Sequence, residues 1–177
     1  MKQLKAVLVG AGNRGCVYAD YSLKHPEELQ IVAVVEVQEL RKTEAAMRYG
    51  IPATEAFSSL DEFLARNIEC DFVINATMDE WHYETAKAII SAGYNMQMEK
   101  PIVPHKEELL ELQTLAKEKA LAMMTSAQFS DIEFCYVVVD FDHKTADNFM
   151  IEVNPAQIVY PSNNVIKSFA ASMIWAG

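Results

Sequence analysis

The sequence contains little positive charge. It has 15 lysines and arginines against 25 aspartates and glutamates, a formal net charge of −10 at pH 7 in 177 residues. Its longest basic cluster is Arg41-Lys42. A field of this sign repels phosphate backbones and anionic membrane surfaces. We therefore expect neither a nucleic acid nor a membrane among the partners of this protein.

Cysteine is also scarce, and long apolar runs are missing. Cys16, Cys70 and Cys135 lie far apart, with no C-x-x-C pair and no histidines at zinc-ligand spacing, so we expect neither a disulfide framework nor a bound metal. No apolar run reaches the roughly 18 residues of a membrane span. Residues 1–6 lead directly into a short apolar run in place of the hydrophobic region of a signal peptide. These absences predict a cytoplasmic protein.

Up to residue 126 the sequence alternates short apolar runs with longer amphipathic ones. The predicted strands are residues 4–9, 30–37, 52–57, 71–76, 94–98 and 121–125, and the predicted helices are residues 13–24, 38–49, 58–66, 80–92 and 104–119. Strands that are apolar on both faces and are each followed by a helix describe a parallel sheet covered on both sides. Right-handed crossovers make this a doubly wound α/β fold of the Rossmann type. We expect it as one domain over residues 1–126.

The pattern changes after Ser126. Residues 134–139 form a strongly β-forming run, residues 149–153 and 157–160 are shorter candidate strands, and residues 165–175 fit either a helix or a strand. We expect residues 127–177 to form a short α+β appendage. The run at 134–139 carries no charge, and an unpaired edge of such a strand favours pairing with another chain. The sequence thus predicts a homo-oligomer assembled through residues 130–177; the alternative is a monomer whose tail folds back onto its own sheet.

Three glycines follow the first predicted strand in the pattern G-x-G-x-x-G, at Gly10, Gly12 and Gly15. Glycines at this spacing often mark a plain turn, but here they lie between a strand and a helix, as dinucleotide binding requires. Gly10 permits the tight turn, and Gly12 lets the backbone approach a pyrophosphate. Gly15 allows the helix to pack closely on the strand, with the helix N-terminus facing the phosphates. The loop predicts a dinucleotide site.

An acidic residue, Glu36, ends the second predicted strand, 21 residues after Gly15. A carboxylate at this position accepts hydrogen bonds from an adenosine ribose and repels a 2′-phosphate. The simpler interpretation of Glu36 is a polar strand end. Arg41 lies nearby in the sequence and suits NADP. We expect NAD as the cofactor, with NADP the less favoured alternative.

Two further polar segments follow the fourth and fifth predicted strands. Thr77 and His82 come after residues 71–76, and Glu99 and Lys100 come after residues 94–98. In an open α/β sheet both segments reach the crevice at the carboxyl ends of the strands, where a nicotinamide ring would lie. Taken singly, Lys100 is more often a solvated lysine, and His82 a histidine whose neighbours satisfy it. Lys100 also suits catalysis, because an ammonium in a partly dry crevice stabilises a developing alkoxide and assists proton transfer.

Together these features resemble the glucose–fructose oxidoreductase, inositol dehydrogenase and rhizopine-catabolism family, written Gfo/Idh/MocA. The resemblance covers residues 3 to about 125 and rests on GAGNRG at 10–15, the acidic strand end, the AT…H pattern and AG…EKP at 92–101. It implies an NAD(P)-dependent oxidoreductase acting on a sugar, a polyol or a derivative, with Lys100 near the oxidised hydroxyl and Glu99 near the ribose or nicotinamide. The cofactor contacts that it implies are Gly10, Gly12, Asn13, Arg14, Gly15, Glu36, Thr77, His82, Glu99 and Lys100.

The resemblance ends where the second domain of that family would begin. In the family this domain supplies an Asp-x-x-x-His pair as proton partner of the lysine, and this sequence contains no such pair. His143, the only histidine after residue 126, follows Asp140 and Asp142 in a predicted polar turn. We expect a substrate domain that is lost, shortened or replaced, and a catalytically impaired chain. A truncated or frame-altered gene product, a fragment of a longer enzyme and a small protein that kept only nucleotide binding all fit.

The alternative function is a non-catalytic dinucleotide-binding or redox-sensing module. A flavodoxin-like or response-regulator-like domain is disfavoured, because neither an acidic cluster nor a flavin phosphate loop follows the first predicted strand.

Overall fold

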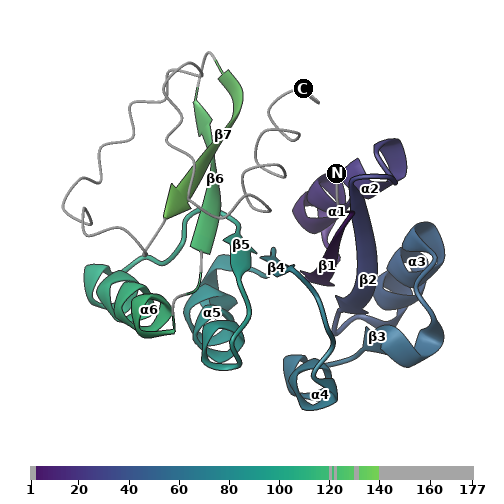
Figure 1. The fold of residues 1–177 in the computed structure, drawn as a ribbon, viewed down its shortest axis with the longest axis horizontal. Helices are drawn as coiled ribbons and strands as arrows, with labels where there is room; N and C mark the ends of the chain where they lie inside the picture. Colours follow the sequence, from purple (N-terminus) through teal and green to yellow (C-terminus); the bar gives the residue numbers. More distant parts are fainter. Residues whose placement is uncertain (1–2, 120, 122, 130–131, 140–177) are drawn as a thin grey trace.

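The structure, a computed structural model, describes residues 3–119, 121, 123–129 and 132–139. In this part of the chain seven strands form one sheet in the order β3-β2-β1-β4-β5-β6-β7 (Figure 1). Strands β1 to β6 are parallel, and β7 runs antiparallel to β6. The chain builds outward from β1 to β3 and then continues on the other side of β1 with β4. This reversal of strand order beside β1 confirms the doubly wound fold predicted from the sequence.

The helices and strands have the following bounds. The strands are β1 (Leu4–Val9), β2 (Leu29–Val35), β3 (Ala56–Phe57), β4 (Phe72–Asn75), β5 (Met96–Met98), β6 (Met123–Phe129) and β7 (Ile132–Val139). The helices are α1 (Asn13–Ala19), α2 (Tyr21–Lys24), α3 (Glu39–Tyr49), α4 (Leu60–Arg66), α5 (His82–Ser91) and α6 (Lys106–Glu118), with short 3₁₀ turns η1 (Ala53–Glu55) and η2 (Asp79–Trp81).

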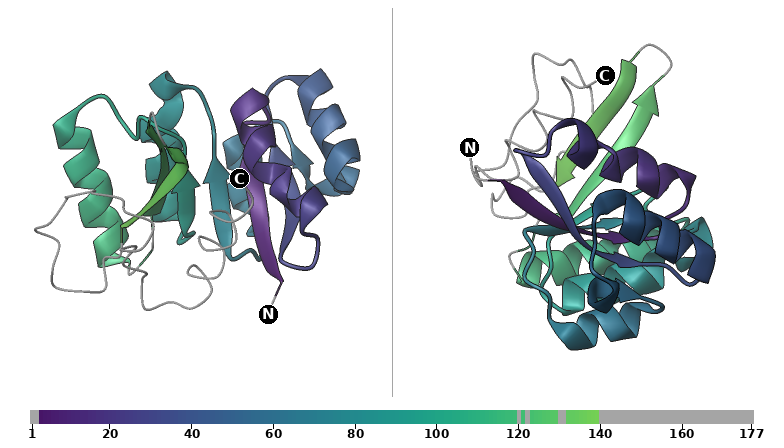
Figure 2. Two further views of the ribbon diagram at one scale, coloured as in Figure 1. Left: turned by 90° about the horizontal axis from the view of Figure 1, so that it is seen from above. Right: turned by 90° about the vertical axis from the view of Figure 1, so that its right-hand side faces the viewer.

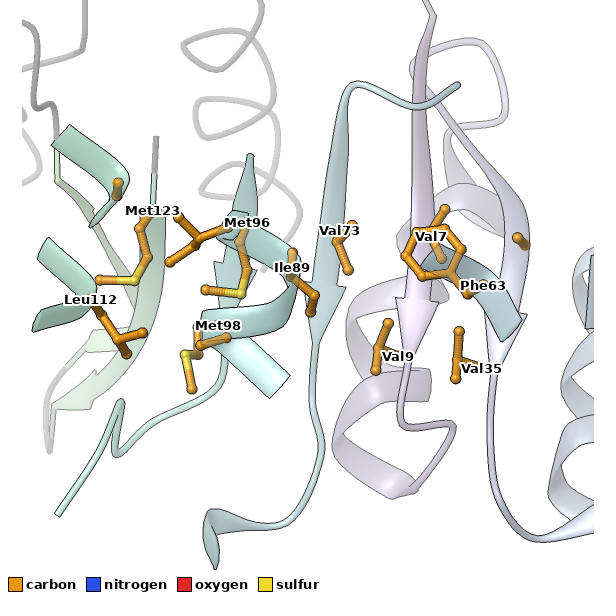
Figure 3. Packing of buried hydrophobic residues seen from close by; sticks show 14 of the residues in the cluster. Val7, Val9, Val35, Phe63, Val73, Ile89, Met96, Met98, Leu112 and Met123 are labelled. Atoms are coloured by element: carbon orange, nitrogen blue, oxygen red, sulfur yellow. The ribbon is translucent and has the colours of Figure 1, made fainter. Parts of the chain in front are cut away.

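Two buried apolar clusters cover the two faces of the sheet. On one face the sheet residue Leu8 lies in a cluster with Tyr18 of α1 and Ala45 of α3. The cluster on the opposite face joins β1, β4, β5 and β6 to helices α4, α5 and α6 (Figures 2 and 3). Its largest fully buried members include Phe63 and Leu112. Burial on both faces explains why β1 and β4 are apolar throughout, apart from Lys5 and Asn75.

Local signals set the ends of two helices as the sequence predicts. Ser59 caps α4, where its side chain accepts a hydrogen bond from the backbone N–H of Glu62 at 3.2 Å. The Glu62 carboxylate accepts in return from the N–H of Ser58 at 2.9 Å, one residue before the position of a standard capping box. Helix α3 ends at Gly50, which adopts a left-handed conformation with φ +67°.

Other predicted elements differ in length. The predicted helix at 13–24 is divided into α1 and α2 by Asp20, whose carboxylate accepts hydrogen bonds from Arg48 and Tyr49 of α3. The predicted helix at 80–92 begins only at His82, after the turn η2. Strand β5 is shorter than predicted: Tyr94 and Asn95 precede it, and their side chains donate hydrogen bonds to the backbone carbonyls of Ile68 and Asp71.

The predicted appendage begins by extending the sheet. Strand β6 continues to Phe129, and β7, which contains the predicted run 134–139, pairs with it. The boundary at residue 126 stays a prediction. The predicted elements at 149–153, 157–160 and 165–175, and the turn with His143, lie outside the described residues. No described helix combines the length and the apolar character needed to cross a membrane.

Candidate functional site

A cavity of about 380 Å³ opens at the carboxyl ends of β1, β2 and β4. This volume lies within the range of small-molecule sites, and the reversal of strand order beside β1 is where an open α/β sheet binds its ligand. The residues that line the cavity are Val9, Gly10, Gly12, Val35, Glu36, Val37, Gln38, Arg41, Leu60, Ala76, Thr77, Met78, Trp81 and Thr85.

The three glycines of the loop are required for different reasons. Gly10 has φ +88°, and a Cβ there would lie 2.5 Å from the carbonyl oxygen of Ala76. A Cβ on Gly15 would lie 2.0 Å from the carbonyl oxygen of Gly10, so α1 packs on the loop only without a side chain here. At Gly12, by contrast, no atom of the described residues other than its chain neighbours lies within 4 Å of the Cβ position. A ligand in the cavity can therefore approach the backbone of the loop at Gly12, which lies on the cavity wall.

Glu36 connects the glycine loop to the start of α3. Its side chain is buried, and its two carboxylate oxygens accept hydrogen bonds from the backbone N–H groups of Ala11 and Gln38, each at 2.9 Å. A carboxylate has about four acceptor positions. Glu36 thus holds the loop in place and retains acceptor capacity toward the cavity.

The loop after β4 is fixed by a network of side-chain hydrogen bonds. The fully buried Asn75 accepts from the Thr77 hydroxyl at 3.0 Å and donates to the Thr85 hydroxyl at 2.9 Å. Thr85 donates to the carbonyl oxygen of Trp81 at 2.7 Å. The network holds Thr77, Trp81 and Thr85 together on one wall of the cavity.

His82 connects this loop to the EKP segment. Its side chain is fully buried, with Nδ1 2.6 Å from the carbonyl oxygen of Pro101 and Nε2 3.1 Å from that of Thr77. His82 does not line the cavity, so its predicted contact with a dinucleotide stays a prediction. The role visible in the structure is to hold together the segments that follow β4 and β5.

Glu99 and Arg14 connect the EKP segment to the glycine loop. The buried Glu99 carboxylate accepts a hydrogen bond from the Tyr18 hydroxyl and lies 3.5 Å from Nε of Arg14. The backbone N–H of Glu99 donates to the carbonyl oxygen of Asn75 at 2.9 Å. Lys100 follows directly and is exposed. These contacts place the predicted proton-transfer lysine at the end of a firmly held strand.

The structure brings part of the predicted site together. Gly10, Gly12, Glu36 and Thr77 line one cavity. Arg14, Gly15, His82 and Glu99 do not line it, although His82 contacts the carbonyl oxygen of the lining residue Thr77. Asn13 is exposed and, like Lys100, is not among the lining residues. Sequence reasoning missed the apolar walls, Val37, Leu60, Met78 and Trp81. Apolar residues directly after a strand end, as in TMDEW, were the available signal.

Potential metal ligands cluster elsewhere. Within the described residues, His25, Glu27 and Glu28 form one group with ligand atoms close enough to share an ion. The group lies just before β2, at the opposite end of that strand from the cavity. It contributes nothing to the site described above.

Fold and site together define a dinucleotide-binding α/β protein of the Rossmann class. Residues 4–127 match the model of an oxidoreductase family with an NAD-binding Rossmann fold, Gfo/Idh/MocA. The chain belongs to this family, which confirms the resemblance based on the glycine loop and the EKP segment.

Relatives of known or partly known function cover the same part of the chain. One is 4-carboxy-2-hydroxymuconate-6-semialdehyde dehydrogenase of Sphingobium sp., 30% identical over 121 residues, which are 68% of this chain and 37% of the relative. Another is inositol 2-dehydrogenase of Corynebacterium glutamicum, 26% identical over 117 residues, 66% of this chain and 34% of the relative. The chain thus spans about a third of the length of the curated relatives that it matches.

Solved structures give the same fold. GenD2 from gentamicin A biosynthesis, in complex with NAD, is 30% identical with a TM-score of 0.64, over 71% of this chain and 34% of that one. The WlbA dehydrogenase of Chromobacterium violaceum, with NADH and UDP-GlcNAcA, is 22% identical with a TM-score of 0.65, over 71% and 35%. A 3-ketoreductase of Actinomadura kijaniata, with NADP and TDP-benzene, is 18% identical with a TM-score of 0.61, over 70% and 37%. Neighbours of this fold therefore bind NAD or NADP.

Proposed function

We propose that this chain binds NAD in the cavity at the carboxyl ends of β1, β2 and β4. We further propose that it is the NAD-binding part of an oxidoreductase that acts on a sugar, a polyol or a derivative of one. The observation that supports it best is the meeting of the glycine loop and the Glu36 carboxylate at that cavity. The substrate class is supported by the names of inositol 2-dehydrogenase and of the WlbA dehydrogenase in complex with UDP-GlcNAcA.

The residues present fit a dinucleotide. The open space at Gly12 admits a pyrophosphate against the backbone. Glu36 has acceptor positions left for ribose hydroxyls and opposes a 2′-phosphate. Arg41 also lines the cavity. Its guanidinium is the group that would bind the 2′-phosphate if NADP were the cofactor.

The chain's own residues divide the remaining work. The bound dinucleotide supplies the hydride chemistry. Lys100 holds the substrate hydroxyl and takes part in moving its proton, since an ammonium stabilises developing negative charge on oxygen. Glu99, held by Tyr18 and Arg14, fixes the backbone from which Lys100 projects.

A non-catalytic dinucleotide-binding module is the second candidate. One observation favours it: none of the four histidines lies four residues after an aspartate, so the sequence holds no Asp-x-x-x-His partner for Lys100. In that case the same cavity binds NAD without turnover.

Turnover separates the two candidates. NAD reduction is followed at 340 nm with a panel of polyols and sugar derivatives, for the wild-type chain, Lys100→Ala and the matched control Lys106→Ala at the start of α6. Because Lys100 is proposed to move the substrate proton, we expect activity that Lys100→Ala removes and Lys106→Ala preserves. Saturable NADH binding without any turnover supports the module, and activity that survives Lys100→Ala contradicts the role of this lysine.

A further inference from the structure

His82 is a fully buried polar side chain outside the cavity. A buried polar group is costly unless it is hydrogen-bonded. The imidazole ring has both nitrogens near backbone carbonyl oxygens, Nδ1 2.6 Å from that of Pro101 and Nε2 3.1 Å from that of Thr77. A neutral imidazole carries one N–H. The shorter contact assigns it to Nδ1, because a nitrogen lone pair so close to a carbonyl oxygen would be repelled. His82 therefore donates to Pro101.

The two carbonyl groups belong to neighbouring parts of the site. Strands β4 and β5 are parallel neighbours whose last residues are paired with each other, so Thr77 and Lys100 are each the second residue beyond that pair. Thr77 lines the cavity, and Pro101 directly follows Lys100. The His82 ring thus lies between the cavity wall and the segment that carries the proposed proton-transfer lysine.

Thr77 does not depend on His82 alone. Its hydroxyl donates to the buried Asn75 at 3.0 Å, and the backbone N–H of Ala76 before it donates to the carbonyl oxygen of Val9 at 2.8 Å. Loss of the longer contact to the imidazole, at 3.1 Å, would leave these hydrogen bonds in place. The cavity wall should therefore keep its shape without the ring.

The segment after β5 depends on His82 to a greater extent. Within the described part of the chain, residues 100–104 make one hydrogen bond, which is the one from the imidazole to Pro101. Apolar packing holds the segment further on, where residues 102–103 lie against the buried cluster that α5 and α6 cover. Lys100 itself is exposed. The backbone on the C-terminal side of Lys100 is thus fixed by the carbonyl group that His82 binds.

We propose that His82 is a positioning residue for Lys100: the N–H on Nδ1 holds the Pro101 carbonyl and thereby sets the lysine relative to the cavity. This inference rests on the proposed function, in which Lys100 moves the substrate proton. Loss of the hydrogen bond should lower kcat and leave the affinity for the dinucleotide nearly unchanged. A residue that only stabilised the fold would not separate these two quantities.

Two substitutions separate the contacts of the ring. Asparagine carries its amide nitrogen on Cγ, as histidine carries Nδ1, so His82→Asn can still donate to Pro101. Glutamine carries its amide nitrogen one bond further out, as histidine carries Nε2, so His82→Gln can donate toward Thr77 but not to Pro101. His82→Leu removes both donors and keeps a side chain of similar size. The matched control is His105→Gln, at an exposed histidine whose side chain makes no capping hydrogen bond at the start of α6.

Steady-state kinetics and ¹⁵N relaxation on the full chain test the proposal. With NAD and the panel of polyols and sugar derivatives, His82→Gln and His82→Leu should lower kcat about tenfold, since a slightly misplaced catalytic group is costly. His82→Asn should restore most of it. The Kd for NADH should stay within about threefold of the wild-type value in every variant. The Lys100 N–H should have an order parameter of about 0.85 in wild type and His82→Asn, and of about 0.6 in the other two. His105→Gln should match the wild type throughout.

The outcomes separate this inference from the function on which it rests. Wild-type kcat in His82→Leu, or a Kd for NADH that rises as kcat falls in His82→Gln, overturns the positioning role and leaves the proposed function standing. If the variants do not fold, long-range ¹H–¹⁵N spectra of the wild-type chain decide, because an Nδ1 of His82 without a proton overturns the proposal. Absence of wild-type turnover refutes the proposed role of Lys100. In that case an order parameter of Lys100 that falls in His82→Gln still supports the hold on its backbone, and an unchanged one overturns it.

Discussion

At the residue scale, Glu36 has two tasks that the sequence pattern alone does not separate. The pattern predicts a carboxylate for the ribose, and the structure shows the same carboxylate holding Ala11 and Gln38 through their backbone N–H groups. We therefore expect cofactor choice and loop order to depend on one side chain. Any substitution of Glu36 tests both.

We predict that the wild-type chain binds NADH at least about tenfold more tightly than NADPH, because a carboxylate and a 2′-phosphate at one position repel each other. Glu36→Ser should narrow or reverse this preference, and it should weaken NADH binding as the loop loses its anchor. Titration of both cofactors into both proteins measures the effect. A wild-type preference for NADPH would show that Arg41 governs the site.

Gln97 supports a stability prediction. Its side chain is 1% exposed, and neither its amide nitrogen nor its amide oxygen has a hydrogen-bond partner in the described structure. A buried amide without partners costs stability, so Gln97→Met should raise the free energy of unfolding by about 1 kcal/mol. Urea denaturation measures this, with Gln30→Met at an exposed position of β2 as the control. A loss of stability specific to Gln97→Met would show that the amide is satisfied.

The sequence made some of the site residues predictable and others not. Gly10, Gly12 and Glu36 could be predicted because their spacing along one strand–loop–helix–strand unit is itself the signal. The part played by His82 could not, since it depends on the carbonyl groups of Thr77, after β4, and Pro101, after β5, meeting across the crossover connection between these strands. Trp81 is an intermediate case: an apolar residue shortly after a strand end was a local signal, but its position on the cavity wall follows from the strand order.

At the element scale, helix ends were predicted correctly where local capping sets them, and incorrectly where contacts with distant residues set them. Gly50 and Ser59 set helix ends through their own conformations and hydrogen bonds, and both were predicted. The division of residues 13–24 into α1 and α2 was not. It coincides with Asp20, which binds Arg48 and Tyr49 of a helix about thirty residues further on.

The capping of α4 gives a prediction at this scale. Ser59→Ala removes the side-chain acceptor for the N–H of Glu62 and should lower the free energy of unfolding by about 1 kcal/mol. Ser59→Asp should restore most of it, because aspartate caps equally well. Urea denaturation of wild type, Ser59→Ala and Ser59→Asp compares their free energies of unfolding. Equal stability of Ser59→Ala and wild type would mean that packing of Phe63, and not the cap, holds this helix.

At the scale of the whole molecule, β7 determines how the sheet ends. One edge of β7 pairs with β6, and the described sheet ends at β7 on that side. The sequence leaves two possibilities for the tail, pairing with another chain or folding back onto its own sheet. Strand β7 does the second, because it pairs with β6 of the same chain. Its other edge still favours pairing with a second copy of the chain, because the run at 134–139 carries no charge.

We therefore predict a homodimer or higher homo-oligomer assembled through residues 130–177. Light scattering at micromolar concentration should give a mass of at least twice the 19.9 kDa of the chain. Val138→Lys, in the strand β7, should reduce that mass, since charge on an edge strand opposes pairing. A mass near 20 kDa that persists on concentration contradicts the prediction.

Binding of the dinucleotide in the cavity beside the glycine loop is the central claim, and Gly12→Val tests it directly. Apart from its chain neighbours, no atom in the described part of the chain lies within 4 Å of the Cβ position of Gly12, so the substitution should leave the fold and the melting temperature unchanged. The same side chain would fill the space that the pyrophosphate needs. Fluorescence titration with NADH should show saturable binding to the wild-type chain and none to a folded Gly12→Val variant. Equal affinity of the two proteins for NADH would contradict the account.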